Sequence, residues 1–135
     1  MTEAFLDSNS LLRHLLGDHP QHSRAATGVI TRIERGELRA HVTDTVIFEV
    51  VFTLDRSYRR PKASIRDVLV PLLDLPGIVL SEKRRMRDAL DLYVDLNIPF
   101  ADAFHAMVLR DRGLTRIISF DRHFDRISGI VRVEP

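Results

Sequence analysis

The stretch Ala4-Phe5-Leu6-Asp7 and the segment after it, SNSLLRHLL at residues 8–16, decide the fold class. The apolar run before Asp7 is typical of a short strand. In residues 8–16, leucines recur at positions 11, 12, 15 and 16, which is the spacing of one helix face. The stretch therefore predicts a strand, a tight connection and a helix, the first unit of an alternating α/β chain.

The remaining sequence continues this alternation. Apolar periodicity predicts helices over 23–35, 64–73, 82–96 and 101–112, and strands over 39–42, 78–80, 116–120 and 130–133. Residues 46–54 suit a buried strand as well as a buried helix, and their length favours the helix. Ser64 with Asp67 resembles a capping box at the start of one helix. We expect a single α/β domain over residues 1–135, a three-layer sandwich with a central, mainly parallel sheet.

Composition narrows the class of protein. The formal net charge is +1, so no global field would gather nucleic acid and any polyanion site must be local. There is no cysteine, which excludes disulfides and thiolate metal sites and fits a reducing compartment. An acid follows soon after the start, and no apolar run approaches the roughly 20 residues of a membrane span. We expect a cytoplasmic protein with no membrane association.

Two acids stand where strands are predicted to end. Asp7 follows the first strand, and Asp121 follows Ile117-Ile118-Ser119-Phe120. In open parallel sheets, ligands bind outside the carboxyl ends of the strands, so these two carboxylates are candidates for one crevice. The structural alternative is that Asp7 caps the next helix and Asp121 begins a turn.

Two further acids lie on predicted helices. Glu49 is the only charge between Val46 and Leu54, so we expect part of its surroundings to be apolar. A buried carboxylate raises its pKa, pairs with a cation or binds a metal, and a salt bridge to an arginine is the structural alternative. Asp102 lies in the first turn of its helix, where the macrodipole alone favours an acid.

Together the four acids point to a divalent metal. Converging carboxylates repel one another unless a cation compensates, and a hard ion such as Mg²⁺ prefers oxygen ligands. Ser8 and Ser119 lie beside two of the acids and could donate hydrogen bonds to them or to a bound water. Arg13 could hold a phosphate near the metal or pair with an acid. The histidines are weaker candidates: His19 and His22 lack a nearby third ligand, and His105 is expected to be a surface residue.

These motifs resemble those of one known family. The opening strand and helix of residues 5–13, the acid within 46–51, the stretch 102–106 and the stretch 119–124 match, in order and spacing, the PIN domain of VapBC-type toxin ribonucleases. The resemblance implies an RNA-cleaving enzyme that uses Mg²⁺ or Mn²⁺, an antitoxin partner that blocks the site, and a dimer. It implies Asp7 and Asp102 as direct ligands, and Glu49 and Asp121 as ligands or as groups that orient water. Ser8 and Ser119 depart from it slightly, since threonine is commoner there.

Two rival functions remain open from the sequence. A haloacid-dehalogenase-like phosphatase also begins with a strand that ends in Asp, but its chemistry needs a second Asp two residues later, where this chain has Asn9. A catalytically inactive PIN-like binding module would use the four acids only for caps and salt bridges. Turnover of small phosphoesters would favour the first rival.

Overall fold

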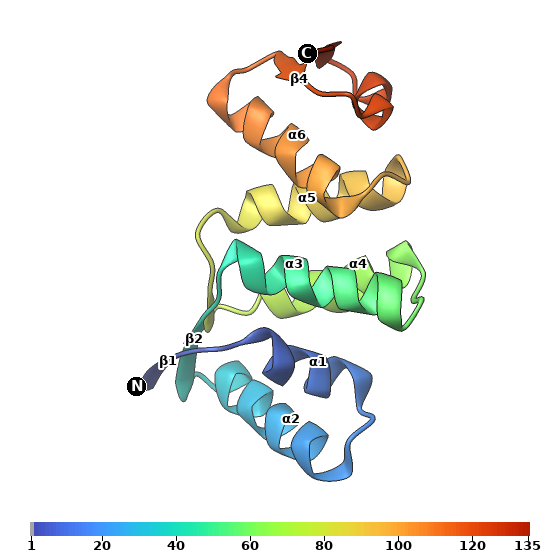
Figure 1. Cartoon of the computed structure of the whole chain (residues 1–135). Coiled ribbons are helices and arrows are strands. Elements are labelled where there is room, and N and C mark those ends of the chain that lie inside the picture. Colours follow the sequence, from blue (N-terminus) through green and yellow to red (C-terminus); the bar gives the residue numbers. More distant parts are fainter. Residues whose placement is uncertain (1) are drawn as a thin grey trace. The chain divides into compact units, whose positions relative to one another are not determined.

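The computed structural model describes residues 2–135, which form two compact units (Figure 1). The first unit ends at Lys83 and the second spans Arg84–Pro135. Each unit contains both helices and strands, and each is described by itself below.

The first unit contains a three-stranded parallel sheet. Its strands are β1 (Thr2–Phe5), β2 (Leu38–His41) and β3 (Ile78–Val79), in the order β1-β2-β3. Ala4 is paired with Ala40, and Ala40 with Ile78. The predicted strands and their parallel direction are confirmed.

Two helices follow β1. Helix α1 (Ser8–Leu16) has the predicted bounds and ends at Gly17, whose φ of 63° is a left-handed conformation that glycine adopts without strain. Helix α2 (Pro20–Glu34) begins three residues before the predicted residue 23. The prediction was wrong because Pro20 suits the first helical position and the His19 side chain accepts a hydrogen bond from the His22 backbone N–H.

The ambiguous segment is helical. Helix α3 (Asp44–Phe52) is followed by a π-helical segment, η1 (Thr53–Ser57). Thr43 caps α3 by accepting a hydrogen bond from the Val46 backbone N–H at 3.4 Å. The buried residues of α3 occupy one side of the helix: Val46, Ile47, Val50 and Val51.

The predicted capping box before α4 (Lys62–Leu73) is wrong. The helix begins before Ser64, and the residue that precedes it is Pro61, which makes no side-chain cap. The backbone of Pro61, with φ −58° and ψ 143°, already directs the chain into the helix. Asp67 instead pairs with Arg66 at 3.1 Å.

The second unit contains two helices and a two-stranded parallel sheet. Helix α5 (Lys83–Asp95) ends before Asn97, whose φ is 51°, and helix α6 (Phe100–Arg112) ends at Gly113. Strand β4 (Arg116–Ile118) pairs in parallel with β5 (Val131–Val133), and a 3₁₀ helix, η2 (Arg122–Arg126), lies between them in the chain. Because β4 ends at Ile118 rather than at residue 120, Asp121 does not follow the strand directly.

The α/β class and the parallel strands are thus confirmed, while the assignment of the whole chain to a single domain stays a prediction. Within residues 2–135, no helix is long and apolar enough to cross a membrane.

Candidate active-site residues

Asp7 lies between β1 and α1 and caps the helix. Its Oδ1 accepts a hydrogen bond from the backbone N–H of Ser10 at 3.0 Å. The cap explains why Asp7 adopts an extended backbone while the chain turns into α1 immediately afterwards. Asp7 therefore does cap the next helix, as the structural alternative predicted. The cap occupies only one oxygen of an exposed carboxylate.

Glu49 is linked to the start of α1 through a serine. The hydroxyl of Ser8, the residue after Asp7, donates a hydrogen bond to Glu49 Oε2 at 2.7 Å. The Ser8 hydroxyl, which was expected to donate to the adjacent Asp7 or to a bound water, thus donates to an acid 41 positions away. The first unit therefore brings the N-terminus of α1, which carries Asp7, next to the middle of α3, which carries Glu49.

Glu49 is not a buried carboxylate, although an apolar residue, Phe52, shares its side of the helix. Its side chain is exposed, on the side of α3 that also carries Thr45 and Phe52, whereas the buried residues face the other way. Helical geometry explains the difference, because residues spaced by three and four share a face even within an apolar run. Within residues 2–135, no arginine or lysine pairs with Glu49, so the salt-bridge alternative does not account for it.

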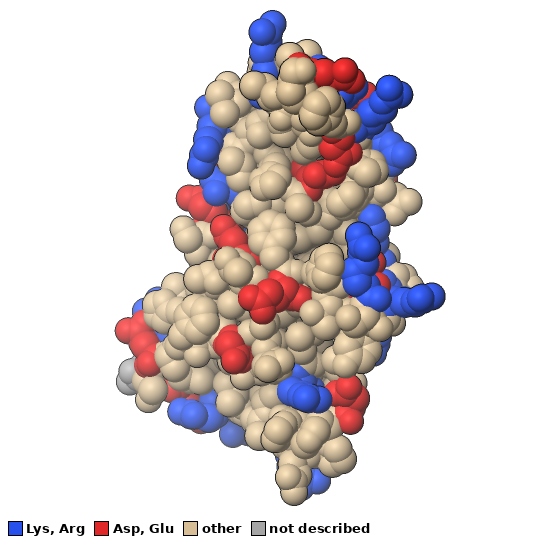
Figure 2. All heavy atoms as spheres, viewed as in Figure 1, with Lys and Arg blue, Asp and Glu red and all other residues tan. Residues whose placement is uncertain are grey.

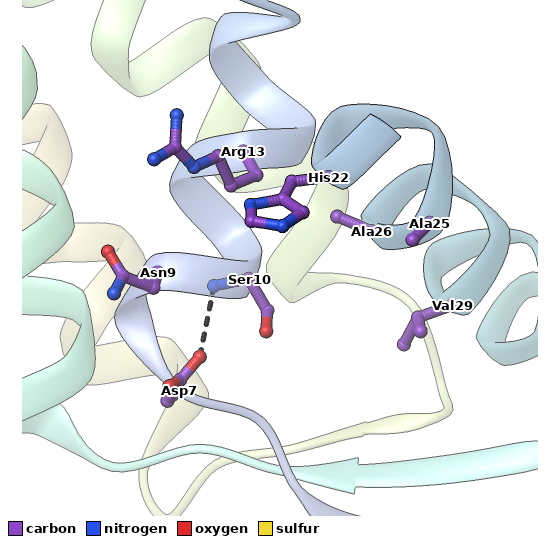
Figure 3. A pocket seen from close by; sticks show the side chains of 8 residues that line it. All are labelled: Asp7, Asn9, Ser10, Arg13, His22, Ala25, Ala26 and Val29. Carbon is purple, nitrogen blue, oxygen red and sulfur yellow. Dashed lines mark hydrogen bonds between the residues drawn. The ribbon is translucent and has the colours of Figure 1, made fainter. Parts of the chain in front are cut away.

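A hollow of about 400 Å³ lies between α1 and α2 beside Asp7 (Figure 3). Ser10 and Arg13 line it from α1, and His22 and Val29 line it from α2. Arg13 also lies 3.6 Å from Asp18, so it takes part in an ion pair at the end of its helix. Both expectations for Arg13 remain compatible with this position, because its side chain is still 40% exposed.

In the second unit, Asp102 is the most enclosed of the four acids. It lies in the first turn of α6, where its charge is favourable to the helix dipole, and its side chain is only 14% exposed. Its neighbours Ala103 and Ala106 are buried on the same helix.

Asp121 forms the start of η2. Its Oδ1 accepts a hydrogen bond from the backbone N–H of His123 at 2.9 Å, and its own N–H donates to Ser119 Oγ at 2.9 Å. Ser119 therefore positions the backbone of Asp121 rather than its carboxylate. Local turn chemistry of this kind is what the structural alternative predicted for Asp121.

His123 joins these two acids, and sequence reasoning missed it. Its Nδ1 lies 2.5 Å from Asp121 Oδ1 and 3.3 Å from Asp102 Oδ2. One ligand atom from each of Asp102, Asp121 and His123 lies within 4.8 Å of the other two, a grouping that can hold a metal ion. The signal in the sequence was the spacing Asp-x-His after a short strand, since a single 3₁₀ turn returns the histidine to the acid that caps it.

The charges of this cluster perturb one another. Burial raises the pKa of Asp102 to about 6, and the hydrogen bond and negative charge of Asp121 act in the same direction. The hydrogen bond with Asp102 lowers the pKa of Asp121. Carboxylates so arranged hold a proton between them unless a cation replaces it.

The four predicted acids are thus divided between the units: Asp7 and Glu49 in the first, Asp102 and Asp121 in the second. Within the described part of the chain, none of the four forms an ion pair with an arginine or a lysine. On the face shown in Figure 2, both signs of charge are present, in keeping with the small net charge.

The pair His19 and His22 has a structural role. The rings of His19 and His22 stack with centroids 4.0 Å apart, and His19 caps α2. His105 is exposed on α6 and contacts the ring of Phe104. Neither position gathers the carboxylates that surround His123.

Comparison with known proteins decides the family. A family model described as "PIN domain" matches residues 4–130, which include all four acids. The chain belongs to the PIN-domain family. The match bears out the three-layer α/β/α fold class expected from the sequence, and it extends across residues of both units.

Curated relatives resemble the chain over almost its full length. "VapC ribonuclease" of Aquifex aeolicus is 25% identical over 130 residues, which are 96% of this chain and 95% of that protein. "Ribonuclease VapC13" of Mycobacterium tuberculosis is 30% identical over 132 residues, which are 95% of this chain and 97% of that protein. "VapC ribonuclease Mb1869c" of Mycobacterium bovis matches to the same extent.

Proposed function

We propose that this PIN-domain protein is a metal-dependent endoribonuclease, the toxin of a VapBC-type pair. The observation that carries the proposal is the cluster of Asp102, Asp121 and His123 in a chain whose relatives are named as VapC ribonucleases. Within residues 2–135, none of the four acids pairs with an arginine or a lysine, which supports a metal ion as their counter-ion.

The donor set fits a divalent ion. Asp102 Oδ2 is shielded from solvent and has no hydrogen-bond partner within residues 2–135, and the pKa of this carboxyl is raised mainly by burial. Both features are those of a carboxylate whose natural counter-ion is a metal. Asp7 and Asp102 are proposed as direct ligands of Mg²⁺ or Mn²⁺, with Glu49 and Asp121 as ligands or as water-orienting groups.

The chain's own groups divide the work of hydrolysis. A bound divalent ion supplies charge neutralisation at the scissile phosphate and acidifies the attacking water. Glu49, which accepts a hydrogen bond from Ser8, would accept a proton from that water, and the hydrogen bond from the Ser10 backbone N–H holds the carboxylate of Asp7. Arg13 lines the hollow beside Asp7, where its exposed guanidinium can bind an RNA phosphate.

Replacing Asp7 by asparagine tests this function. Asp7→Asn keeps an oxygen that can accept the Ser10 hydrogen bond, so we expect an unchanged circular dichroism spectrum and no cleavage of RNA. Glu37→Gln is the matched control, because the exposed side chain of Glu37 has no partner among residues 2–135, and this variant should cleave at the wild-type rate. Undiminished cleavage by Asp7→Asn would reject the nuclease. Turnover of small phosphoesters in its place would favour the dehalogenase-like phosphatase.

Partners and assembly form part of the same proposal. We propose an antitoxin of the VapB type that blocks the site, a homodimer, and action in the cytoplasm. Light scattering after gel filtration should give twice the chain mass of 15.5 kDa, and addition of the antitoxin should stop cleavage. A mass of 15.5 kDa at working concentration would remove the dimer from the account.

We also propose that the two units belong to a single PIN domain, which the family match over residues 4–130 supports. A single domain of this size unfolds in one cooperative transition. Calorimetric and van't Hoff enthalpies of unfolding should therefore agree. Two separate transitions would contradict the assignment.

A further inference from the structure

The candidate metal cluster contains a nitrogen donor as well as oxygens. His123 lies in η2, where the buried ring of Phe124 holds the turn and the carboxylate of Asp121 caps it. Its imidazole is therefore held beside the two acids by backbone structure and not only by its own side-chain contacts.

Two atoms of the cluster lie close to other donor atoms but make no hydrogen bond. His123 Nδ1 and Asp102 Oδ2 are both shielded from solvent, and neither makes a hydrogen bond within residues 2–135, although His123 Nδ1 lies 2.5 Å from Asp121 Oδ1. The separation of His123 Nδ1 and Asp102 Oδ2 is 3.3 Å, but the geometry is not that of a hydrogen bond. Buried polar atoms in native proteins rarely lack a hydrogen bond, so an imidazole nitrogen this close to two carboxylate oxygens, with no hydrogen bond formed, points to a species that accepts electron pairs from all three atoms.

The spacing suits coordination to one ion. Donor atoms bound at about 2.0–2.2 Å to a common ion lie at most about 4.4 Å apart. The three donor atoms here lie within 4.8 Å of one another, so only small side-chain movements are needed. The set is one imidazole nitrogen with two carboxylate oxygens.

We propose that His123 Nδ1 is a metal ligand together with Asp102 and Asp121, and that it makes the site select Mn²⁺ over Mg²⁺. Mg²⁺ strongly prefers oxygen and keeps its waters, whereas first-row transition ions accept imidazole. The inference rests on the proposed function only in requiring a divalent ion, and it names the donor that chooses between the two candidate ions.

Electron spin-echo spectroscopy of bound Mn²⁺ tests the nitrogen ligand directly, without reference to activity. We expect ¹⁴N coupling in the wild-type protein and its loss in His123→Gln. His105→Gln is the matched control, because His105 is exposed on α6 and the chemical change is the same. Bound Mn²⁺ without ¹⁴N coupling in the wild type, or coupling that persists in His123→Gln, overturns the inference and leaves the nuclease proposal intact.

Calorimetric titration with each ion tests selectivity. We expect His123→Gln to weaken Mn²⁺ binding by about 10–100-fold, the range for losing a supporting group at a metal site, and to change Mg²⁺ binding by less than about threefold. His123→Asp restores an oxygen donor and should narrow the preference for Mn²⁺ over Mg²⁺. Equal weakening of both ions in His123→Gln, with the fold intact by circular dichroism, overturns the selectivity. Failure of the wild type to bind either ion would reject both this inference and the metal-dependent nuclease.

Discussion

The two units present their acids in opposite ways. In the first, Asp7 and Glu49 are exposed, and each is held by one short contact, a helix cap or a serine hydroxyl. In the second, Asp102 is largely enclosed. There, His123 Nδ1 lies 3.3 Å from Asp102 Oδ2 and 2.5 Å from Asp121 Oδ1. The carboxylates of the two units therefore differ in burial and in the charged groups around them.

The difference shows what each pair contributes. The exposed pair is positioned by hydrogen bonds that cost little and leave oxygens for a ligand. The enclosed pair carries electrostatic strain, seen in the raised pKa of Asp102, which a cation relieves. The proposed metal dependence therefore makes Asp102 the acid whose electrostatics a bound cation should change most.

The largest expected effect tests whether the exposed pair, Asp7 and Glu49, and the enclosed pair, Asp102 and Asp121, are needed for the same reaction. Asp102→Asn should reduce RNA cleavage by at least about 100-fold, equivalent to about 3 kcal/mol of transition-state stabilisation, because a charged metal ligand is lost. Single-turnover cleavage rates should place Asp102→Asn within about tenfold of Asp7→Asn. A large loss in only one of the two variants would show that the pairs are not equivalent in the chemistry.

A smaller effect is expected from the serine that holds Glu49. Ser8→Ala removes the 2.7 Å hydrogen bond and should slow cleavage by about tenfold, as for other groups that orient a metal-site residue. Ser10→Ala is the matched control on the same helix, because it keeps the backbone N–H that Asp7 accepts from. Equal rates for the two variants would remove Ser8 from the account.

The smallest effect concerns stability and pH in metal-free protein. Because the pKa of Asp102 is raised from 3.8 to about 6, the folded state binds more protons than the unfolded state between these values. Stability from this group is thus present below pH 3.8 and is lost as pH rises through about 6.

Asp102→Asn removes that titration. In urea unfolding with a chelator present, the variant should gain on the order of 1 kcal/mol relative to wild type between pH 4 and pH 7. The lowered pKa of Asp121 acts below its ordinary value of 3.8, outside this window. A difference that is constant with pH would contradict the assigned cause.

Periodicity and strand-end placement predicted much of this molecule. Helix α1 was predicted to the residue, because helix starts and ends are visible in local patterns, whereas the roles of the four acids stay a prediction. The predicted start of α2 was wrong because Pro20 and His19 act through cap geometry that apolar spacing does not report.

The electrostatics were not predictable in the same way. Glu49 was considered as a buried carboxylate because of its apolar neighbours in the sequence, but the rotation of α3 exposes it, and a nine-residue helix gives little periodicity from which to fix that rotation. His123 was missed because its importance depends on the fold of η2 and on Asp102, which lies 21 positions earlier. The spacing between His123 and Asp121 is visible in the sequence, but the closeness of His123 to Asp102 is not.

Metal dependence is the most direct test of the central claim, that the four acids serve a cation and not caps and salt bridges alone. Purified protein is stripped with a chelator, and RNA cleavage is followed as Mn²⁺ or Mg²⁺ is titrated back. The account predicts no cleavage without metal and a saturable return of activity on adding it. Cleavage that persists at full rate in excess chelator would contradict it.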